Sequence, residues 1–337
     1  MSLLFSLQLI QGETLDGAPN GQSAIISSDA KLKTIFEDAV FTEGPAVALD
    51  GTVFFSDITR TSLTNNQAGH IWKHDPSTGK TSVFRSPSGM TNGIIFDLKG
   101  EMVVAEGADH GGRRITRTDL ATGKSEILAG LYNGRPFNSP NDLTIDDQGR
   151  IYFTDPRYFG YEAVDQPIMG VYRIDPDRSI HLVISDAGKP NGIAVSPDQK
   201  TLYIACYDNG RMGSLPEGMR ARRGRMAILA YDLRPNGTAE FRSVLVDYPD
   251  GGGPDGMALD VDGNIYMGGN FQPRGVRVYS SKGEQLGFVA TPSVARNVSF
   301  GRGLTAKTLY IAAGGGLYSI QVQKRGYHPV AAVQQSQ

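Results

Sequence analysis

Cysteine and net charge are both scarce in this sequence. Cys206 is the single cysteine among 337 residues, so the chain cannot form an internal disulfide, and no Cys/His spacing typical of a zinc site occurs. The 33 Lys and Arg residues nearly balance 35 Asp and Glu, which gives a formal charge of -2. A chain with almost no net charge has no strong positive electrostatic potential to attract nucleic acid or an anionic membrane. We therefore expect neither as a partner.

Long apolar runs are absent as well. No stretch approaches the roughly 20 residues that span a bilayer. The N-terminal stretch MSLLFSLQLI is mildly apolar, but it lacks the Lys or Arg of a signal-peptide n-region, and Gln8 interrupts it. We expect residues 1–30 to form an N-terminal arm or strand. The single cysteine fits the cytoplasm as the compartment, with the periplasm or secretion as alternatives.

Glycine, by contrast, is abundant, with 42 residues, and part of it recurs at fixed spacing. Six similar segments each begin with a carboxylate or carboxamide residue that precedes an apolar run. These key residues are Glu43, Asn92, Asn141, Asn191, Asp255 and Asn297, at intervals of 49, 49, 50, 64 and 42 residues. In four segments a glycine stands eight positions later, at Gly51, Gly100, Gly149 and Gly263. Such a glycine supplies the positive φ that a tight hairpin turn requires.

Further strand-turn-strand pieces lie between the six segments, for example HIWKHDPSTGKTSVFR and GVYRIDPDRSIHLVIS. Each repeat therefore supplies about four strands, and a period of roughly 40 to 50 residues is typical of propeller blades. The sequence predicts an all-β fold, a six-bladed β-propeller formed by residues 1–337 as a single domain. An open sandwich is the alternative, but it needs no fixed period and explains the glycine spacing poorly.

The longest interval, which ends at Asp255, contains an inter-strand insertion over residues 207–226. The insertion carries five arginines, Arg211, Arg220, Arg222, Arg223 and Arg225. A charge run of this kind is usually a solvated loop. The alternatives are a flap over the channel mouth and a contact between subunits. We expect a monomer or a homodimer.

The six key residues should gather at one mouth of the central channel, because the innermost strand of each blade lines that channel. All six side chains carry oxygens, and convergent oxygens with few charges suit a hard divalent cation, above all Ca2+. Mg2+ and Mn2+ are alternatives, and Zn2+ is less suited because the set holds no histidine or thiol. In the competing interpretation, the Asn-Gly and Asp-Gly pairs only form turns. That interpretation explains Glu43 poorly, since glutamate is a weak turn former.

A second group of polar residues is expected where the returning strands reach the same mouth. It comprises Asp57, Glu106, Asp155 and Asn270, and the loops EGADHGGRR and TDPRYFGYE add His110, Arg113, Arg157 and Tyr158. We treat these residues as candidate substrate contacts. A lone histidine in a glycine-rich loop is more often simply exposed, so the case for His110 depends on its position alone.

Five strings resemble the gluconolactonase/regucalcin (SMP-30) family, and in particular its bacterial gluconolactonase-like branch. In chain order they are FTEGPAV, EGADHGGRRITRTDL, FNSPNDLTIDDQGRIYFTDPRY, KPNGIAVSPDQKTLYIA and GPDGMALDVDGNIY. The resemblance runs from about Phe41 to Ile320 and implies a six-bladed calcium propeller. It also implies that Glu43, Asn191 and Asp255 hold the metal, and that Asn141 contacts the metal or the substrate.

One position departs from the family pattern. Regucalcins carry an arginine two residues before the third key asparagine, where it binds sugar lactones, and this chain has Ser139 there. The quartet Glu43, Asn141, Asn191 and Asp255 is also similar to the catalytic calcium site of diisopropylfluorophosphatase. The ligand set alone therefore does not separate a lactonase from a phosphotriesterase, whereas the surrounding strings favour the lactonase.

Together, the residues and the resemblance predict a metal-dependent hydrolase that opens a sugar lactone such as glucono-1,5-lactone. A bound cation would polarise the lactone carbonyl as a Lewis acid, and water would attack that carbonyl. Asp255 is the expected general base. The expected substrate-binding residues are Asn141, His110, Arg113, Asp155 and Tyr158. The alternatives are a calcium-dependent phosphotriesterase or aryl esterase, and a non-catalytic propeller that serves as a binding module.

Overall fold

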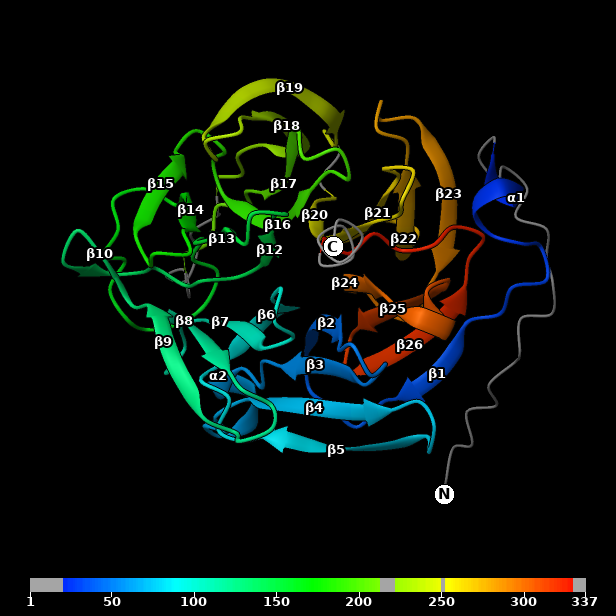
Figure 1. Cartoon of the computed structure of the whole chain (residues 1–337), viewed down its shortest axis with the longest axis horizontal. Coiled ribbons are helices and arrows are strands. Elements are labelled where there is room, and N and C mark those ends of the chain that lie inside the picture. Colours follow the sequence, from blue (N-terminus) through cyan, green and yellow to red (C-terminus); the bar gives the residue numbers. More distant parts are fainter. Residues whose placement is uncertain (1–20, 213–221, 250–251, 330–337) are drawn as a thin grey trace.

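The computed structural model describes residues 21–212, 222–249 and 252–329 and forms a ring of six four-stranded antiparallel sheets (Figure 1). In the first sheet, β2 (Thr42–Val47) is innermost, and β3 (Val53–Asp57), β4 (His70–Asp75) and β5 (Lys80–Arg85) follow outwards. The next four sheets repeat this order. They are β6 (Thr91–Phe96), β7 (Met102–Glu106), β8 (Arg114–Thr118) and β9 (Ser125–Ala129); β12 (Leu143–Ile145), β13 (Ile151–Thr154), β14 (Val171–Ile174) and β15 (Ile180–Ile184); β16 (Pro190–Val195), β17 (Thr201–Tyr207), β18 (Met226–Leu233) and β19 (Ala239–Asp247); and β20 (Pro254–Leu259), β21 (Ile265–Gly269), β22 (Gly275–Tyr279) and β23 (Gln285–Ala290). The predicted six-bladed β-propeller is confirmed.

The sixth sheet closes the ring with strands from both ends of the described chain. Its inner strands are β24 (Ala295–Phe300), β25 (Thr308–Ala313) and β26 (Gly316–Gln321), and its outermost strand is β1 (Lys33–Phe36). β1 runs antiparallel to β26, with Lys33 opposite Ser319. Helix α1 (Gln22–Ile25) packs against β23. Residues 1–20 of the predicted arm lie outside the described residues.

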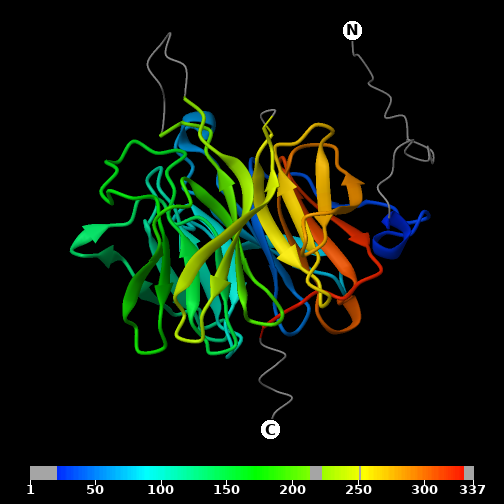
Figure 2. The same ribbon diagram turned by 90° about the horizontal axis from the view of Figure 1, so that it is seen from above.

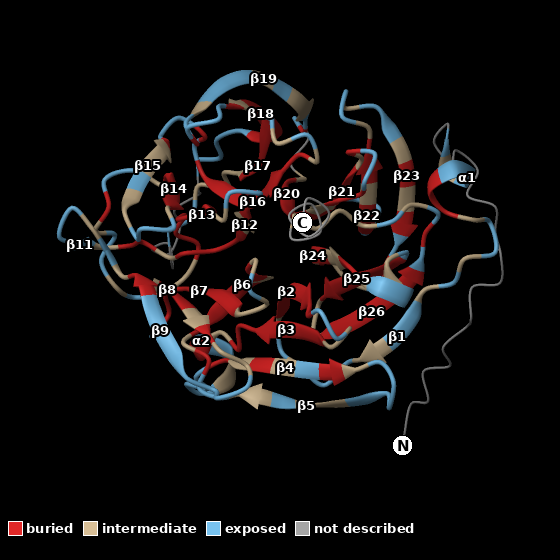
Figure 3. Cartoon of the chain, in the orientation of Figure 1, coloured by how far each residue is buried: buried red, intermediate tan, exposed pale blue. Residues whose placement is uncertain are grey.

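Burial decreases from the inner strands outwards. Every residue of β2 is buried, whereas no residue of β5 is fully buried. Figure 3 shows the same gradient in the other sheets. Apolar side chains of adjacent sheets fill the space between blades, as where the Phe54 and Phe96 ring centres lie 5.7 Å apart. Because both faces of each inner strand are covered, these strands read as near-continuous apolar runs.

The turns follow the predicted glycine spacing. Gly51, Gly100, Gly149 and Gly263 have φ angles of 88°, 79°, 78° and 80°. The predicted insertion joins β17 to β18, and its residues 213–221 lie outside the described residues. Shorter elements in other loops are α2 (Thr61–Thr64), β10 (Leu131–Tyr132), β11 (Arg135–Pro136) and the 3-10 helix η1 (Gly303–Thr305). Among the described residues, no helix has the length and apolar character to cross a membrane.

The C-terminal segment covers one end of the central channel. The Tyr327 N–H donates to the carbonyl oxygen of Leu259 at 2.9 Å, and His328 Nε2 donates to that of Gly301 at 3.0 Å. Viewed from the side, the end of the described chain and the β17–β18 connection lie on opposite faces of the ring (Figure 2). A channel cavity of about 120 Å³ lies behind this segment. The opposite mouth is therefore the one at which a ligand could enter.

Candidate functional site

Five of the six key residues lie at an irregularity where an inner strand meets the open mouth; the third sheet, which carries Asn141, pairs without a register shift. The register with the second strand shifts between Glu43 and Ala46 in the first sheet and between Pro254 and Met257 in the fifth. The second, fourth and sixth sheets have the same irregularity. A bulge re-aims the side chain at its position. All six key residues are buried, with at most 9% of each exposed.

The glycine after several key residues allows the inner strands to approach closely. A Cβ on Gly192 would lie 2.2 Å from the carbonyl oxygen of Asp255, and a Cβ on Gly256 would lie 2.1 Å from Cγ of Asn297. Both glycines stand inside inner strands rather than in turns. The turn-forming interpretation of these Asn-Gly and Asp-Gly pairs is therefore wrong, and close strand approach is what requires glycine here.

Two of the predicted ligands, Glu43 and Asp255, are buried carboxylates that repel each other. Burial raises the pKa of Glu43 well above its usual value, and the charge of Asp255 raises it further. Burial also raises the pKa of Asp255, while the Arg296 guanidinium and the Asn191 side chain oppose the rise. Arg296 Nη1 lies 3.5 Å from Asp255 Oδ2. One guanidinium thus faces two buried carboxylates, so the single positive charge of Arg296 does not balance their two negative charges.

Carboxamides add neutral oxygens at the same mouth. Oδ1 of Asn92 is buried and has no hydrogen-bond partner in the part of the chain that the structure describes. An unpaired buried oxygen costs about 1–3 kcal/mol. Hydrogen bonds to Thr154 O (2.9 Å) and from Gly93 N (2.7 Å) fix the backbone of Asn141. A cation that prefers oxygen ligands would relieve both the unpaired oxygen and the repulsion between the carboxylates.

Across the described ranges, no three His, Cys, Asp or Glu side chains are arranged to hold a metal. The predicted set needs no such group, because it combines the carboxylates of Glu43 and Asp255 with the carboxamides of Asn141 and Asn191. Oxygen-only ligands with low total charge are the chemistry of Ca2+ sites. These residues therefore fit a hard divalent cation, and their role as its ligands stays a prediction.

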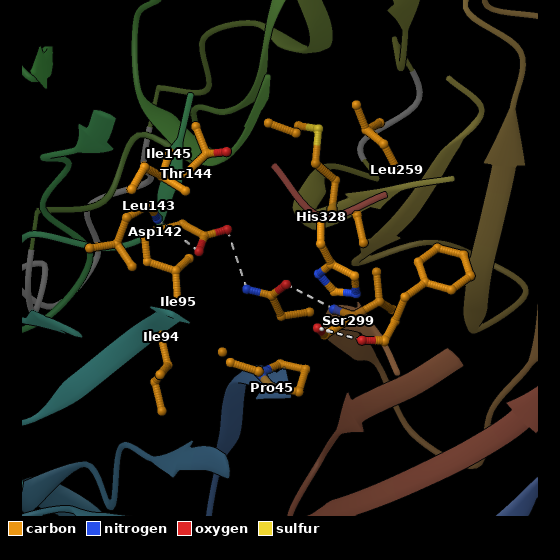
Figure 4. A pocket seen from close by; sticks show the side chains of 18 of the residues that line it. Pro45, Ile94, Ile95, Asp142, Leu143, Thr144, Ile145, Leu259, Ser299 and His328 are labelled. Carbon is orange, nitrogen blue, oxygen red and sulfur yellow. Dashed lines mark hydrogen bonds between the residues drawn. The ribbon is translucent and has the colours of Figure 1, made fainter. Parts of the chain in front are cut away.

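Asp142 is a third buried carboxylate to which the sequence analysis gave no role. It extends into the channel (Figure 4), where its Oδ2 accepts a hydrogen bond from Asn297 Nδ2 at 3.3 Å. Its Oδ1 accepts the backbone N–H of Leu143 at 3.0 Å. Burial raises the pKa of Asp142 to about 7, and the charge of Asp255 contributes. The signal that could have revealed it is that an aspartate follows Asn141, where four other blades have glycine.

Tyr158 lies beside the predicted metal ligands. Burial raises the pKa of its hydroxyl well above the usual value, the charge of Asp255 adds to the rise, and a hydrogen bond with Asn191 opposes it. The hydroxyl donates to the carbonyl oxygen of Tyr207 at 3.0 Å. Lys189 Nζ stands 4.2 Å from the ring centre. The structure thus brings Tyr158 to the site as a buried wall whose hydroxyl is already engaged.

Asp155 and Arg113 both hold the loop that precedes the third inner strand. The oxygens of Asp155 accept the N–H groups of Asn138 and Ser139 at 2.8 and 2.7 Å, and the residue is fully buried. Burial raises its pKa to about 7, against the effect of these two hydrogen bonds. Arg113 Nε donates to the carbonyl oxygen of Phe137 at 2.7 Å. Both side chains therefore support the loop.

The remaining candidates are spread over different environments. His110 is exposed, with its ring centre 5.9 Å from that of Tyr161. Arg157 is buried and binds carbonyl oxygens of its own loop. Glu106 is buried in the second sheet and bonded to side chains there, whereas Asn270 is exposed. These four are not brought together with the predicted ligands.

Asp57 repeats in the first sheet what Asp155 does in the third. Its Oδ1 accepts the N–H groups of Val40 and Phe41 at 3.2 and 3.0 Å. At the position where the regucalcin pattern has arginine, Ser139 Oγ accepts the N–H of Ala108 at 2.9 Å. Ser139 thus links the loop before the third inner strand to the loop after β7.

Two arginines and two phenylalanines at the mouth were missed by the sequence analysis. Arg60, Arg296, Phe41 and Phe159 form what we call the rim cluster. The guanidinium carbons of Arg60 and Arg296 lie 5.6 and 4.8 Å from the centre of the Phe41 ring. Arg60 also lies 4.3 Å from the centre of the Phe159 ring. Long side chains from separate blades meet here, so no local sequence pattern marks the cluster.

Comparison with known proteins places the chain among lactone-hydrolase sequences. The sequence description of the SMP-30/Gluconolactonase/LRE-like region matches residues 41–315. A protein of Zymomonas mobilis named gluconolactonase is 29% identical over 332 residues, which cover 90% of this chain and 84% of that protein. Lactonase drp35 of Staphylococcus epidermidis is 26% identical and covers 83% of this chain and 81% of its own length.

Solved structures share the same architecture. A gluconolactonase from Xanthomonas campestris is 30% identical, with a TM-score of 0.73 over 91% of this chain and 95% of that one. The calcium-binding protein regucalcin of Agrobacterium tumefaciens has the same fold, with 17% identity and a TM-score of 0.68 over 88% of this chain and 96% of that one. The matched region extends from the first inner strand to the last blade. The chain therefore belongs to the SMP-30/gluconolactonase/LRE-like family.

Proposed function

We propose that this protein is a divalent-cation-dependent lactonase that hydrolyses a sugar lactone. The observation that carries the proposal is the pair of buried carboxylates, Glu43 and Asp255, placed among carboxamides with a single guanidinium as counter-charge. Relatives that cover most of this chain are named gluconolactonase or lactonase, which supports the reaction class. Site and relatives are independent reasons for the same assignment.

The proposed cation ligands are Glu43, Asn141, Asn191 and Asp255, and Ca2+ is the preferred ion because every donor is an oxygen. When bound, such an ion supplies Lewis-acid polarisation of a carbonyl. Asn141 and Asn191 add oxygens without adding negative charge. The Oδ1 atom of Asn92, which has no hydrogen-bond partner among the described residues, is a further candidate cation ligand.

In the proposed reaction, Asp255 acts as the general base. It removes a proton from water as the water oxygen attacks the lactone carbonyl carbon. The bond between this carbon and the ring oxygen then breaks, the ring oxygen takes up a proton, and a hydroxy acid is released. Arg296 keeps the Asp255 carboxylate charged and oriented, since its Nη1 lies 3.5 Å from Oδ2.

The other residues shape the site. Tyr158 supplies an apolar wall against one side of the substrate. Asp155 and Arg113 fix the loop that carries Asn141, and in this proposal they act on the substrate through that loop. His110 is exposed in the loop after β7, away from the predicted ligands, and in this proposal it contacts only the far hydroxyls of the sugar.

A lactone panel read with a pH indicator tests the proposal. We expect hydrolysis of glucono-1,5-lactone or a related sugar lactone, loss of activity after exhaustive chelation, and recovery with Ca2+. Asp255→Ala should abolish turnover and weaken cation binding while the circular dichroism spectrum and the melting temperature stay close to those of the wild type. Full activity after chelation, or wild-type turnover in this variant, would sink the proposal. Faster turnover of paraoxon or a fluorophosphate than of any lactone would favour the phosphotriesterase alternative.

A further inference from the structure

We propose that the lactone carries a second, anionic group, a carboxylate or a phosphate, and that Arg60 binds this group at the rim cluster together with Arg296. The inference rests on the proposed lactonase function for the ring-opening step and adds the class of lactone that the site selects.

The two guanidiniums are held next to each other by aromatic rings. Both lie over Phe41, at 5.6 Å for Arg60 and 4.8 Å for Arg296. Phe159 supports Arg60 from a second side, at 4.3 Å, and its ring packs edge-on against Phe41. Stacking on rings fixes a guanidinium in place without using its N–H donors. The donors of Arg60 are thus positioned and still available.

The two arginines differ in their carboxylate partners: Arg296 lies 3.5 Å from Asp255, whereas Arg60 has no such pair among the described residues. Arg60 makes no ion pair with any carboxylate of the described residues, and its acidic neighbour Asp109 gives both oxygens to Thr61, at 2.7 and 2.8 Å. Arg296 Nε is buried and lacks a hydrogen-bond partner within the described ranges. Burial lowers the pKa of Arg60 and the repulsion of Arg296 adds to this, while the charge of Asp109 opposes it.

A third cation lies on the same mouth. Lys189 is buried, and its Nζ donates to Asn209 Oδ1 at 2.9 Å and to the carbonyl oxygen of Arg211, both uncharged acceptors. Asp208 is the acidic group that interacts with Lys189, and its Oδ1 accepts the N–H of Gly210 at 3.0 Å. Lys189 therefore adds positive charge near this mouth, although its own ammonium is already engaged and the whole chain has a net charge of -2.

Arg60 and Arg296 differ in their relation to the reacting end of the substrate. Arg296 reaches Asp255 directly, at 3.5 Å. Arg60 has no contact with Glu43, Asn141, Asn191 or Asp255 and stacks instead on rings at the rim. A lactone whose carbonyl lies at Asp255 would therefore meet Arg60 with its far end. A planar fork of N–H donors at that place matches a carboxylate or phosphate group.

Two matched substrate pairs test the inference and separate the two sources of the anion. The phosphate pair is 6-phosphoglucono-1,5-lactone and glucono-1,5-lactone, and the carboxylate pair is galactaro-1,4-lactone and galactono-1,4-lactone. We expect the anionic member of at least one pair to have the higher kcat/KM, by about tenfold or more. Arg60→Gln should lower this ratio by about tenfold, and Arg60→Lys should lower it less, because the charge is kept and only the fork is lost.

The control variant is Arg234→Gln, which removes one charge from an exposed arginine in the turn before β19, where it pairs with Glu240. It should leave the ratio unchanged. Titration calorimetry with glucitol 6-phosphate and galactonate, each against its uncharged alditol, measures the anion site without turnover. Binding that depends on charge and on Arg60, combined with no hydrolysis of any lactone, would keep the anion site and overturn the lactonase proposal. Equal affinity for charged and uncharged ligands, or a ratio unaffected by Arg60→Gln, would overturn the inference itself.

Discussion

Replacing Asp142 with asparagine should stabilise the cation-free protein above neutral pH. Burial raises the pKa of Asp142 to about 7, against about 3.9 in an unfolded chain. Because the folded-state pKa is the higher one, folding is not penalised below about pH 4, and the penalty grows as the pH rises towards 7. Three units at 1.36 kcal/mol each correspond to about 4 kcal/mol. Asparagine stays uncharged and avoids this cost.

Part of the gain is lost at Asn297. Its Nδ2 donates to Asp142 Oδ2 at 3.3 Å, while its Oδ1 is held by the Val298 N–H at 2.8 Å, so the amide cannot turn over freely. If asparagine replaced Asp142, its own NH2 group would face the Nδ2 donor of Asn297, and the lost hydrogen bond would cost about 1 kcal/mol. We therefore expect Asp142→Asn to add about 3 kcal/mol to the free energy of unfolding above pH 7. Below about pH 4 it should bring no gain.

Urea unfolding of the chelated wild type and variant, at about pH 4 and about pH 8, measures the difference. The control is Asp38→Asn, which removes the same charge from an exposed residue and should leave the pH dependence unchanged. If the wild-type and Asp142→Asn curves keep a constant separation over this pH range, the Asp142 carboxylate does not carry the desolvation cost. A variant that is less stable at high pH would contradict the sign of the argument.

Three further substitutions test how the site is positioned. Gly192→Ala should destabilise the protein by about 1–3 kcal/mol and lower cation affinity, because the new Cβ would meet the Asp255 carbonyl; Gly130→Ala, which meets only an ordinary contact, should be nearly neutral in urea unfolding. Asp155→Ala should cost about 2 kcal/mol or more by leaving two buried N–H groups unpaired, and it should raise KM for the lactone; unchanged stability would contradict its loop-holding role. Arg296→Gln should move the acid limb of the kcat/KM profile to higher pH, because the guanidinium lowers the pKa of Asp255; an unmoved limb in a pH–rate series would exclude this coupling.

The fold could be predicted because it is repeated. The recurrence of the key residues and the glycine eight positions later in four segments both follow from blade geometry, and all four of those glycines have positive φ. The closing strand β1 could not be found this way. Its residues, Lys33–Phe36, are partly exposed and pair with β26 from the far end of the chain, so nothing local distinguishes them from a loop.

The contacts of the site residues could be predicted less well, because a sequence does not show in which direction a side chain points. Asp155 was expected at the mouth from its place after β13, but the sequence does not say that its oxygens point back to Asn138 and Ser139. Arg60 and Arg296 are far apart in the sequence, and only the folded ring brings them over one phenylalanine. Part of the arginine-rich insertion lies outside the described residues, so the choice between flap, loop and subunit contact stays a prediction.

Inner strands carry the candidate ligands and loops carry part of the rim cluster, and this difference affects substrate choice. The candidate ligands are carried at the starts of inner strands, where glycines pressed against neighbouring backbones fix the strand positions, as at Gly192 and Gly256. The rim cluster instead draws Arg60 and Phe159 from loops that follow the second strands β3 and β13. A substitution at Arg60 can therefore change what the far end of a lactone meets without moving Asp255. A substitution at an inner-strand glycine must move both, because there the neighbouring backbone has no space to yield.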